Sequence, residues 1–210
     1  MQADHEVPQW LRWAREIHQI GQTGLYFTQN EFDRQRFQRL MDLAAEMINE
    51  HVEQPLEEIK AALCAQPGYI TPKVDVRGAV FKDDRILMVR EMLDGLWSLP
   101  GGYADVNEAP SSMVEREILE ETGIHAKARR VVGVYEANHD REPVNVFHCY
   151  KVLFLCDFQN GTPRPSYETT EVQFYRLDEL PELSINRTQE RHIREAFLQL
   201  HDPTRPAVFD

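Results

Sequence analysis

The sequence predicts a mixed α/β domain, residues 69–210, preceded by a small all-α domain, residues 1–68. Three observations lead to this prediction. Apolar residues recur at helical spacing through residues 7–63, where no strand pattern occurs. Two prolines and a glycine between residues 67 and 72 are typical of a linker. Beyond it, short runs rich in β-branched and aromatic residues alternate with two helical patterns, as in α/β domains.

Three helices are expected in the N-terminal domain. The first should break at Gly21 and Gly24, because glycine disfavours the helix interior. A capping box of Thr28 and Glu31 would begin the second helix, and a third would follow Pro55 at about 55–63. Three short helices bury too little apolar surface to be stable alone. We therefore expect them to pack on the second domain or on a second copy of themselves.

The second domain should contain five strands and two helices. The strands are expected at 74–81, 86–89, 130–136, 145–156 and 171–176, and the helices at about 110–122 and 188–200. Asp83 and Asp84 suit a hairpin turn between the first two strands. In the first helix, Pro110 suits the first turn, Ser112 and Glu115 can form a capping box, and Gly123 ends the helix.

Composition limits the class of protein. Hydrophobic residues make up 42% and charged residues 28%, the balance of a globular protein. The net charge of −12 repels phosphate backbones, so we expect no nucleic-acid partner. The sequence shows no apolar run long enough for a membrane helix and no secretory pattern at its start, so no membrane partner is expected. Three cysteines without metal-site spacing predict a reducing, cytoplasmic location.

The segment 102–124 contains the residues best suited to chemistry. On a helix, Glu117, Glu120 and Glu121 share one face, because they are spaced at i, i+3 and i+4. Three carboxylates this close repel one another, so one of them should hold its proton above its usual pKa unless a cation lies beside it. Oxygen ligands suit a hard divalent ion, Mg²⁺ or Mn²⁺. The alternative is an ordinary solvated acidic face.

The same segment resembles the Nudix box, a motif of nine positions at fixed spacing. All nine match here, and they are Gly102, Glu108, Arg116, Glu117, Ile118, Glu120, Glu121, Gly123 and Ile124. A chance match to all nine is on the order of one in a million for a chain of this length. The resemblance implies a Nudix α/β/α sandwich with a mixed sheet. It also implies metal-dependent hydrolysis of a pyrophosphate bond.

The resemblance also implies roles for individual residues. Glu117, Glu120, Glu121 and the backbone carbonyl of Gly102 would bind the metal. Arg116 and Glu108 would have a supporting role: they would pair and hold the loop against the helix. The position of the general base varies among Nudix proteins and cannot be transferred. Our candidates are Glu168 first and Glu171 second, ahead of Glu136 and Glu142, and the alternative is that both leading candidates face solvent.

Three further side chains are candidates for substrate binding. Trp97 lies just before the box, where its ring could stack on a base, although core packing is the alternative. His139 and Arg141 lie between two expected strands and could contact a phosphate or a leaving group. For these two residues, the alternative is a solvated turn.

A second resemblance concerns the N-terminal stretch Trp10–Met47 and the strand 147–156. Both are similar to bacterial CDP-choline pyrophosphatases and their ADP-ribose pyrophosphatase-like relatives. This resemblance implies a homodimer that uses the N-terminal helices. It also implies a substrate in which a nucleoside diphosphate is linked to another group, CDP-choline or ADP-ribose first. Residues 137–143 are shorter and less basic than in that group, which argues against choline nucleotides.

Two other functions compete with this reading. One is another Nudix activity, the hydrolysis of a nucleoside triphosphate or of an RNA 5′ end. The other is a non-catalytic nucleotide sensor. Such sensors usually lack some of the box glutamates, whereas Glu117, Glu120 and Glu121 are all present in this chain.

Overall fold

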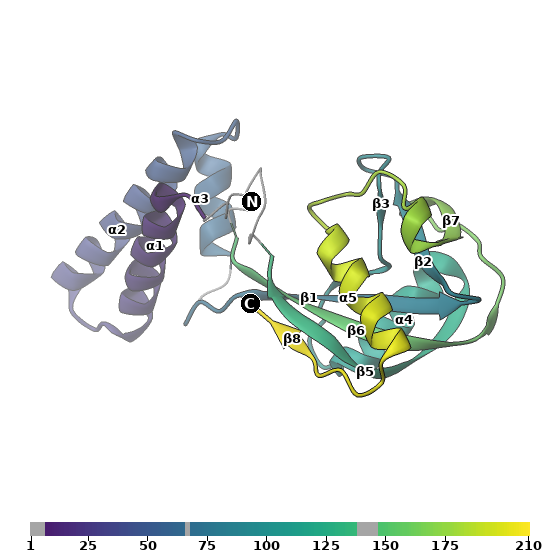
Figure 1. The fold of residues 1–210 in the computed structure, drawn as a ribbon. Coiled ribbons are helices and arrows are strands. Elements are labelled where there is room, and N and C mark those ends of the chain that lie inside the picture. The colour runs from purple at the N-terminus through teal and green to yellow at the C-terminus, as the bar shows by residue number, and fades with distance from the viewer. Residues whose placement is uncertain (1–6, 66–67, 138–146) are drawn as a thin grey trace. The chain divides into compact units, whose positions relative to one another are not determined.

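The computed structural model describes residues 7–65, 68–137 and 147–210. These residues form two compact units. The first is the described part of residues 1–72 and 138–148, and the second comprises Lys73–Ala137 and Cys149–Asp210. Figure 1 shows the helices of the first unit and the sheet with its covering helices in the second.

The first unit contains the three helices expected from the sequence. They are α1 (Gln9–Phe27), α2 (Glu31–Asn49) and α3 (Leu56–Cys64). Their shared core includes Ala14, Ala45, Ile48, Ile59 and Leu63. The prediction of a helical N-terminal region is therefore confirmed.

Two details of these helices were predicted wrongly. α1 continues through Gly21 and Gly24 because the glycines let α2 approach closely. A Cβ atom on Gly24 would lie 2.4 Å from the ring of Phe37. The second helix is capped by Asn30, whose side chain accepts from the Phe32 N–H at 2.9 Å, and Thr28 is not its cap.

The second unit is built on one mixed sheet, and the five expected strands are all present in it. They are β1 (Lys73–Lys82), β2 (Arg85–Glu91), β5 (Ile124–Glu136), β6 (Cys149–Gly161) and β7 (Thr169–Tyr175). Three short strands were not expected, because two or three residues give no periodic pattern: β3 (Trp97–Ser98), β4 (Gly101–Tyr103) and β8 (Val208–Phe209). The strand order is β3-β2-β1-β6-β5-β8, with β4 paired to β1 and β7 paired to β2.

Strand direction and turn geometry explain how this sheet is connected. β1 and β6 run parallel, whereas β1 and β2 form an antiparallel hairpin. The hairpin turns at Asp83 and Asp84, which have φ values of 51° and 56° and confirm the expected turn. The parallel pairing brings Asp75 of β1 beside Lys151 of β6.

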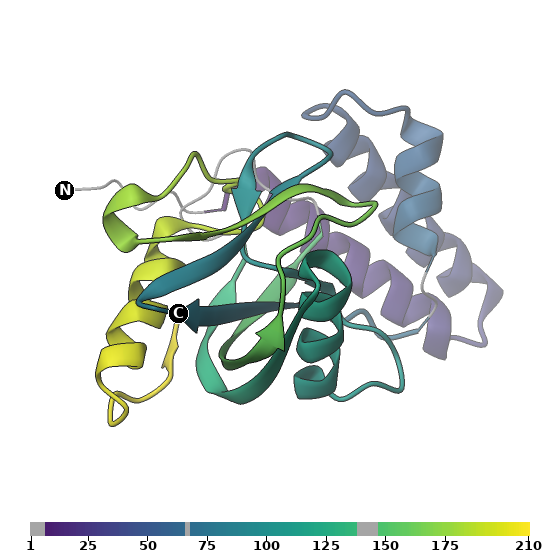
Figure 2. The same ribbon diagram turned by 90° about the vertical axis from the view of Figure 1, so that its right-hand side faces the viewer.

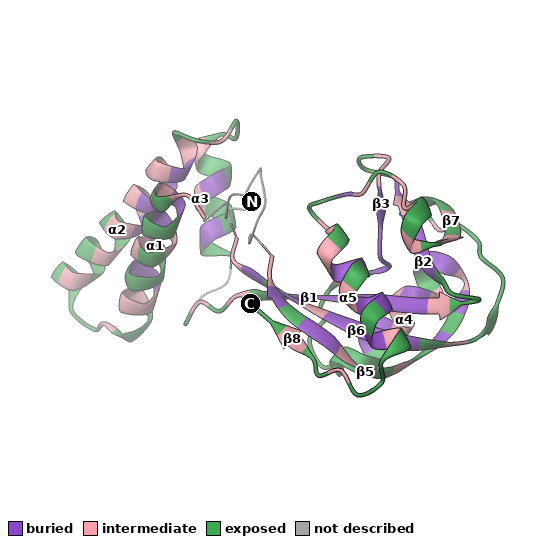
Figure 3. Ribbon diagram, viewed as in Figure 1, coloured by how far each residue is buried: buried purple, intermediate pink, exposed green. Residues whose placement is uncertain are grey.

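Helices cover both faces of the sheet, so the predicted α/β/α sandwich is confirmed (Figure 2). α4 (Pro110–Thr122) buries Met113, Val114 and Ile118 against one face. α5 (Glu190–His201) buries apolar side chains against the other, near the short 3₁₀ helix η1 (Leu177–Glu179). Figure 3 shows buried residues along the strands β1, β5 and β6. Among the described residues, no helix is long and apolar enough to cross a membrane.

The position of α4 depends on its two ends and on one glycine of β1. Pro110 stands in the first turn, and Gly123 ends the helix with φ 71°, both as expected. The expected capping box of Ser112 and Glu115 is wrong, because Glu115 instead accepts from the Ala128 N–H at 2.9 Å. A Cβ atom on Gly78 would lie 2.6 Å from Cδ1 of Ile118, so the glycine lets α4 lie close to β1.

Candidate active site

A cavity of about 300 Å³ lies along the acidic face of α4. It is lined by residues of α4, of β4 with the loop that follows it, and of the segment before β7. The lining residues are Gly102, Tyr103, Asp105, Arg116, Glu117, Glu120, Glu121, Ser166, Tyr167 and Glu168. The structure therefore brings the glutamates of α4 together with Gly102 and Glu168, which lie far from one another in the sequence.

Glu121 is the most buried carboxyl group of the cavity, with 7% of its surface exposed. Its Oε2 atom accepts a hydrogen bond from the Gly101 N–H at 2.9 Å. Burial raises the pKa of Glu121 to about 8, against the opposing effects of Arg77 and of the Gly101 N–H. Burial likewise raises the pKa of Glu117. A raised pKa was expected from mutual repulsion, but desolvation is the larger cause at both residues.

Arg116 links four carboxylates around the cavity. Its guanidinium donates to Glu108 at 2.8 Å, which is the expected pair, and to Glu117 at 2.8 Å. It also donates to Glu120 and Asp105, at 3.0 Å in each case. Within the part of the chain that the structure describes, no three His, Cys, Asp or Glu side chains form a ready metal cluster. In this arrangement the guanidinium lies between Glu117 and Glu120.

The donor set nevertheless fits a hard divalent cation. Glu117, Glu120 and Glu121 supply carboxylate oxygens from one side of α4, and Gly102 lies next to them. A Cβ atom on Gly102 would lie 3.6 Å from Oε2 of Glu117, so this backbone passes close to the carboxylate. Partly buried carboxyl groups with raised pKa values mark a place where a bound cation would offset the cost of burying charge.

A buried ion cluster supports the loop before Gly102. Arg77 donates to Asp75 at 2.8 Å and, through Nη1, to the backbone carbonyl of Leu99 at 3.0 Å. Lys151 donates to the same Asp75 carboxylate at 2.9 Å. Each of these charges is almost fully buried, and none was predicted as part of the site. The available signal was the occurrence of charged residues inside otherwise apolar strands.

The segment before β7 places Glu168 on the cavity. The Glu168 N–H donates to the Ser166 hydroxyl at 3.1 Å, and its carbonyl accepts from the Met92 N–H at 2.9 Å. The Thr169 hydroxyl donates to the backbone carbonyl of Glu121 at 3.0 Å. Glu168 therefore faces the same space as the glutamates of α4.

The other candidates for the general base lie elsewhere. Glu171 is in β7, where it pairs with Arg90 at 2.6 Å, and it does not line the cavity. Glu136 ends β5 and is likewise not among the lining residues. Glu142 lies outside the described residues.

Trp97, the one described residue among the three candidates for substrate binding, does not line this cavity either. Trp97 is only 8% exposed and packs edge-to-face on Tyr175, with ring centroids 5.0 Å apart. Its ring therefore serves the core, which was the alternative interpretation. His139 and Arg141 lie outside the described residues.

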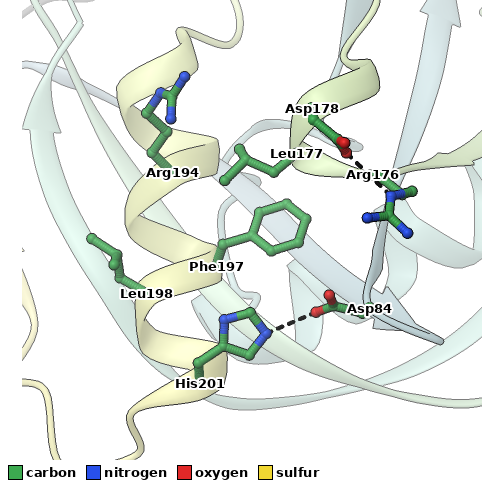
Figure 4. A pocket seen from close by; sticks show the side chains of 8 residues that line it. All are labelled: Asp84, Arg176, Leu177, Asp178, Arg194, Phe197, Leu198 and His201. Carbon is green, nitrogen blue, oxygen red and sulfur yellow. Dashed lines mark hydrogen bonds and ion pairs between the residues drawn. The ribbon is translucent and has the colours of Figure 1, made fainter.

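A second cavity, of about 320 Å³, lies between α5, η1 and the β1–β2 turn (Figure 4). Its charged groups pair with opposite charges. His201 contacts Asp84 at 2.7 Å, Arg176 contacts Asp178 at 3.1 Å, and Arg194 pairs with Glu190. Its lining mixes acidic and basic side chains, whereas the charged side chains that line the cavity along α4 are mostly carboxylates. The cavity along α4 is therefore the candidate active site.

Comparison with known proteins agrees with this fold. The NUDIX domain model matches residues 71–198. A second model, described as a UDP-X-like, N-terminal oligomerisation domain, matches residues 8–63. The chain thus belongs to the Nudix family, and it is a pyrophosphohydrolase of that family.

Three members of the family are similar to this chain. The putative ADP-ribose pyrophosphatase YjhB of Bacillus subtilis is 37% identical over 201 residues, which cover 96% of this chain and 97% of that protein. The crystal structure of a UDP-X diphosphatase is 32% identical, with a TM-score of 0.61, and the match covers 96% of this chain and 98% of that one. An ADP-ribose pyrophosphatase from Streptococcus suis 89-1591 is 35% identical, with a TM-score of 0.60, over 67% of this chain and 100% of that one.

Proposed function

We propose that this protein hydrolyses the pyrophosphate bond of a nucleoside diphosphate linked to another group, with ADP-ribose as the first candidate. The products would be a nucleoside monophosphate and the phosphorylated remainder. The observation that carries this proposal is the cavity in which Glu117, Glu120, Glu121 and Glu168 surround one space. Relatives that are named ADP-ribose pyrophosphatases support the choice of substrate. CDP-choline is a further candidate.

UDP-linked compounds are the second candidate substrates. Their support is the UDP-X diphosphatase whose structure matches nearly the whole chain. Nucleoside triphosphates and RNA 5′ ends rank lower, because Arg116 is the only cationic side chain among the described residues that line the cavity. Each additional phosphate group would bring further negative charge to an acidic surface.

We propose Mg²⁺ or Mn²⁺ as the cofactor, held by Glu117, Glu120, Glu121 and the carbonyl of Gly102. When bound, the ion would neutralise phosphate charge and lower the pKa of the attacking water. The Gly101 N–H keeps the Glu121 carboxylate oriented toward the cavity. Arg116 would give up its contacts with Glu117 and Glu120.

The supporting and proton-transfer roles then fall to other residues of the chain. Arg116 would keep its ion pair with Glu108, which ties the loop after β4 to α4. Glu168 would accept the proton of the attacking water, because it is the carboxylate of the cavity that comes from outside α4 and the loop before it. The fixed turn around Ser166 and Thr169 supports this assignment.

We also propose that the chain works as a homodimer through its helical domain, residues 1–68, with catalysis in residues 69–210. The support is the matching N-terminal model, which is described as an oligomerisation domain. The cytoplasmic location inferred from the cysteines stays a prediction.

The test is a substrate panel with purified full-length protein and Mg²⁺ or Mn²⁺. The panel covers ADP-ribose, UDP-sugars, CDP-choline, nucleoside triphosphates and a 5′-triphosphate RNA, with products identified by chromatography. We expect release of a nucleoside monophosphate from one diphosphate-linked compound. We also expect a loss of at least about 100-fold in kcat for Glu121→Gln, typical of the removal of a group that acts on the transition state.

Glu115→Gln is the matched control, because Glu115 lies on the same helix but binds the Ala128 N–H away from the cavity. Circular dichroism should show that both variants are folded. Near-normal turnover by Glu121→Gln would refute the metal assignment. Activity on triphosphates or RNA alone would refute the proposed substrate class.

A further inference from the structure

The cavity along α4 offers very little uncharged surface. Six of its ten lining residues carry a charge, and Gly102 and Ser166 are small. Of the described side chains that line it, only Tyr103 and Tyr167 are large and uncharged. Carboxylates and an ion can hold a pyrophosphate, but they offer no surface on which an organic ring could pack. Among the described lining residues, such a contact therefore falls to one of these tyrosines.

Tyr167 is presented to the cavity by a well-fixed turn. Its side chain is among the most exposed of the large aromatic residues, at 81%. The Ser166 N–H donates to the Thr169 hydroxyl at 3.0 Å, and that hydroxyl binds the backbone carbonyl of Glu121. Tyr167 thus lies between two residues that are tied to each other. The turn therefore fixes the backbone that carries the ring, so a ligand that covers the ring need not order this segment.

Tyr103 differs from Tyr167 in its surroundings. It follows Gly102 in β4 and is 54% exposed. Lys73 Nζ lies 5.3 Å from the centroid of its ring, so a cation already occupies part of its surroundings. Tyr167 is the more accessible of the two rings.

We propose that Tyr167 is a specificity-determining residue that stacks on the nucleobase of the substrate. This inference rests on the proposed function, which supplies a planar ring attached to the pyrophosphate. An aromatic side chain that faces water gains contact and loses hydration when a base covers it. The same gain is not available to the charged side chains around it.

The Tyr167 hydroxyl makes a separate contribution from the ring. It donates a hydrogen bond to the Glu168 carboxylate, which raises the pKa of the phenol. This contact orients the carboxylate proposed as the general base. Tyr167→Phe removes this contact and keeps the ring, whereas Tyr167→Leu removes both.

The test measures binding of two probes to the full chain in Mg²⁺ by isothermal titration calorimetry. AMP carries a base, and ribose 5-phosphate carries a phosphate on a sugar without one. We expect Tyr167→Leu to weaken AMP about tenfold, as for the loss of one base stack, and to leave ribose 5-phosphate unchanged. Tyr167→Phe should bind AMP as the wild type does. Phe209→Leu is the control, since Phe209 is equally exposed, at 82%, and does not line the cavity.

Other outcomes would overturn the proposal. If Tyr167→Leu weakened the binding of both probes equally, the site would be generally disturbed. If it weakened the binding of ribose 5-phosphate alone, the ring would contact the sugar and not the base. An AMP affinity that falls with Tyr103→Leu and not with Tyr167→Leu would move the stack to β4. Because these measurements need no turnover, they remain informative if the proposed hydrolysis fails. Conversely, suppose that the wild type hydrolyses a diphosphate-linked substrate while Tyr167→Leu binds AMP as tightly as the wild type does. That result would refute the stacking proposal alone.

Discussion

Replacing Gly101 by alanine should displace the loop that supports Glu121, and so lower both stability and activity. Gly101 has φ 136°, a conformation that L side chains rarely adopt. A Cβ atom there would lie 2.1 Å from the carbonyl oxygen of Val76 and 3.0 Å from Cα of Arg77, so the clash is with backbone. Carbon and carbonyl oxygen atoms normally stay more than about 3.3 Å apart. The loop must therefore move by about 1 Å.

The size of the effect follows from these contacts. Overpacking against fixed backbone costs about 1–3 kcal/mol, and the unfavourable φ adds about 1–2 kcal/mol. We expect Gly101→Ala to lower the free energy of unfolding by about 2–5 kcal/mol. Moving the Gly101 N–H also weakens its 2.9 Å hydrogen bond to Glu121. A displacement of 1 Å near reacting groups can cost about 100-fold in rate, so a large loss of kcat/KM should accompany the loss of stability.

Urea unfolding and steady-state kinetics on the best substrate of the panel measure both effects. Gly95→Ala is the matched control. Gly95 also has a positive φ, 70°, but the nearest atom to an added Cβ is the flexible end of Arg90 at 4.0 Å. The control should lose only about 1–2 kcal/mol, from the unfavourable φ, and keep its activity. If both variants lost the same stability and both stayed active, the clash with Val76 would not control this loop.

Three further predictions concern the site, its support and the metal. Thr169→Val should lower the free energy of unfolding by about 1–3 kcal/mol in urea titrations, because the buried carbonyl of Glu121 loses its hydroxyl donor. Arg205 holds the pKa of Glu195 below its usual value, so the pair stabilises the fold above that usual value and the stabilisation is lost as pH falls through the lowered pKa. Arg205→Met should therefore cost about 1 kcal/mol at pH 7 and nothing in acid, measured by urea unfolding at several pH values. Mg²⁺ or Mn²⁺ should raise the melting temperature of the wild type in calorimetry, EDTA should reverse the rise, and Glu121→Gln should show little of it. No shift with either ion would contradict the metal assignment.

Much of the fold could be predicted because it depends on local pattern. Short apolar runs predicted β1 and β2, and the two aspartates between them predicted the turn. Pro110 and Gly123 predicted both ends of α4. Sequence pattern predicted less where a residue type has two structural uses, as glycine does when it either ends a helix or allows close packing. Gly24 lies inside α1 because α2 packs against it, and no local signal distinguishes this use from a helix break.

The candidate site likewise has features that follow from local sequence and features that depend on tertiary contacts. The sequence by itself determined that Glu117, Glu120 and Glu121 share a helix face, because 3.6 residues per turn align positions spaced by three and four. It ranked Glu168 before Glu171 as the candidate base, although the two are close in the chain and both near a strand. Only the tertiary structure shows which of them lies at the cavity, since the Thr169 hydroxyl binds the backbone of α4 beside Glu168 while Glu171 pairs with Arg90.

The surroundings that give these carboxylates their chemistry also depend on tertiary contacts. The buried support of Arg77, Asp75 and Lys151 forms only when β1 and β6 pair in register. The raised pKa of Glu121 comes from its burial beneath the loop that this cluster supports. Residue type and spacing determined which groups could act. Burial and hydrogen bonding depend on contacts between distant segments, so the tertiary structure decided where those groups act and in which protonation state.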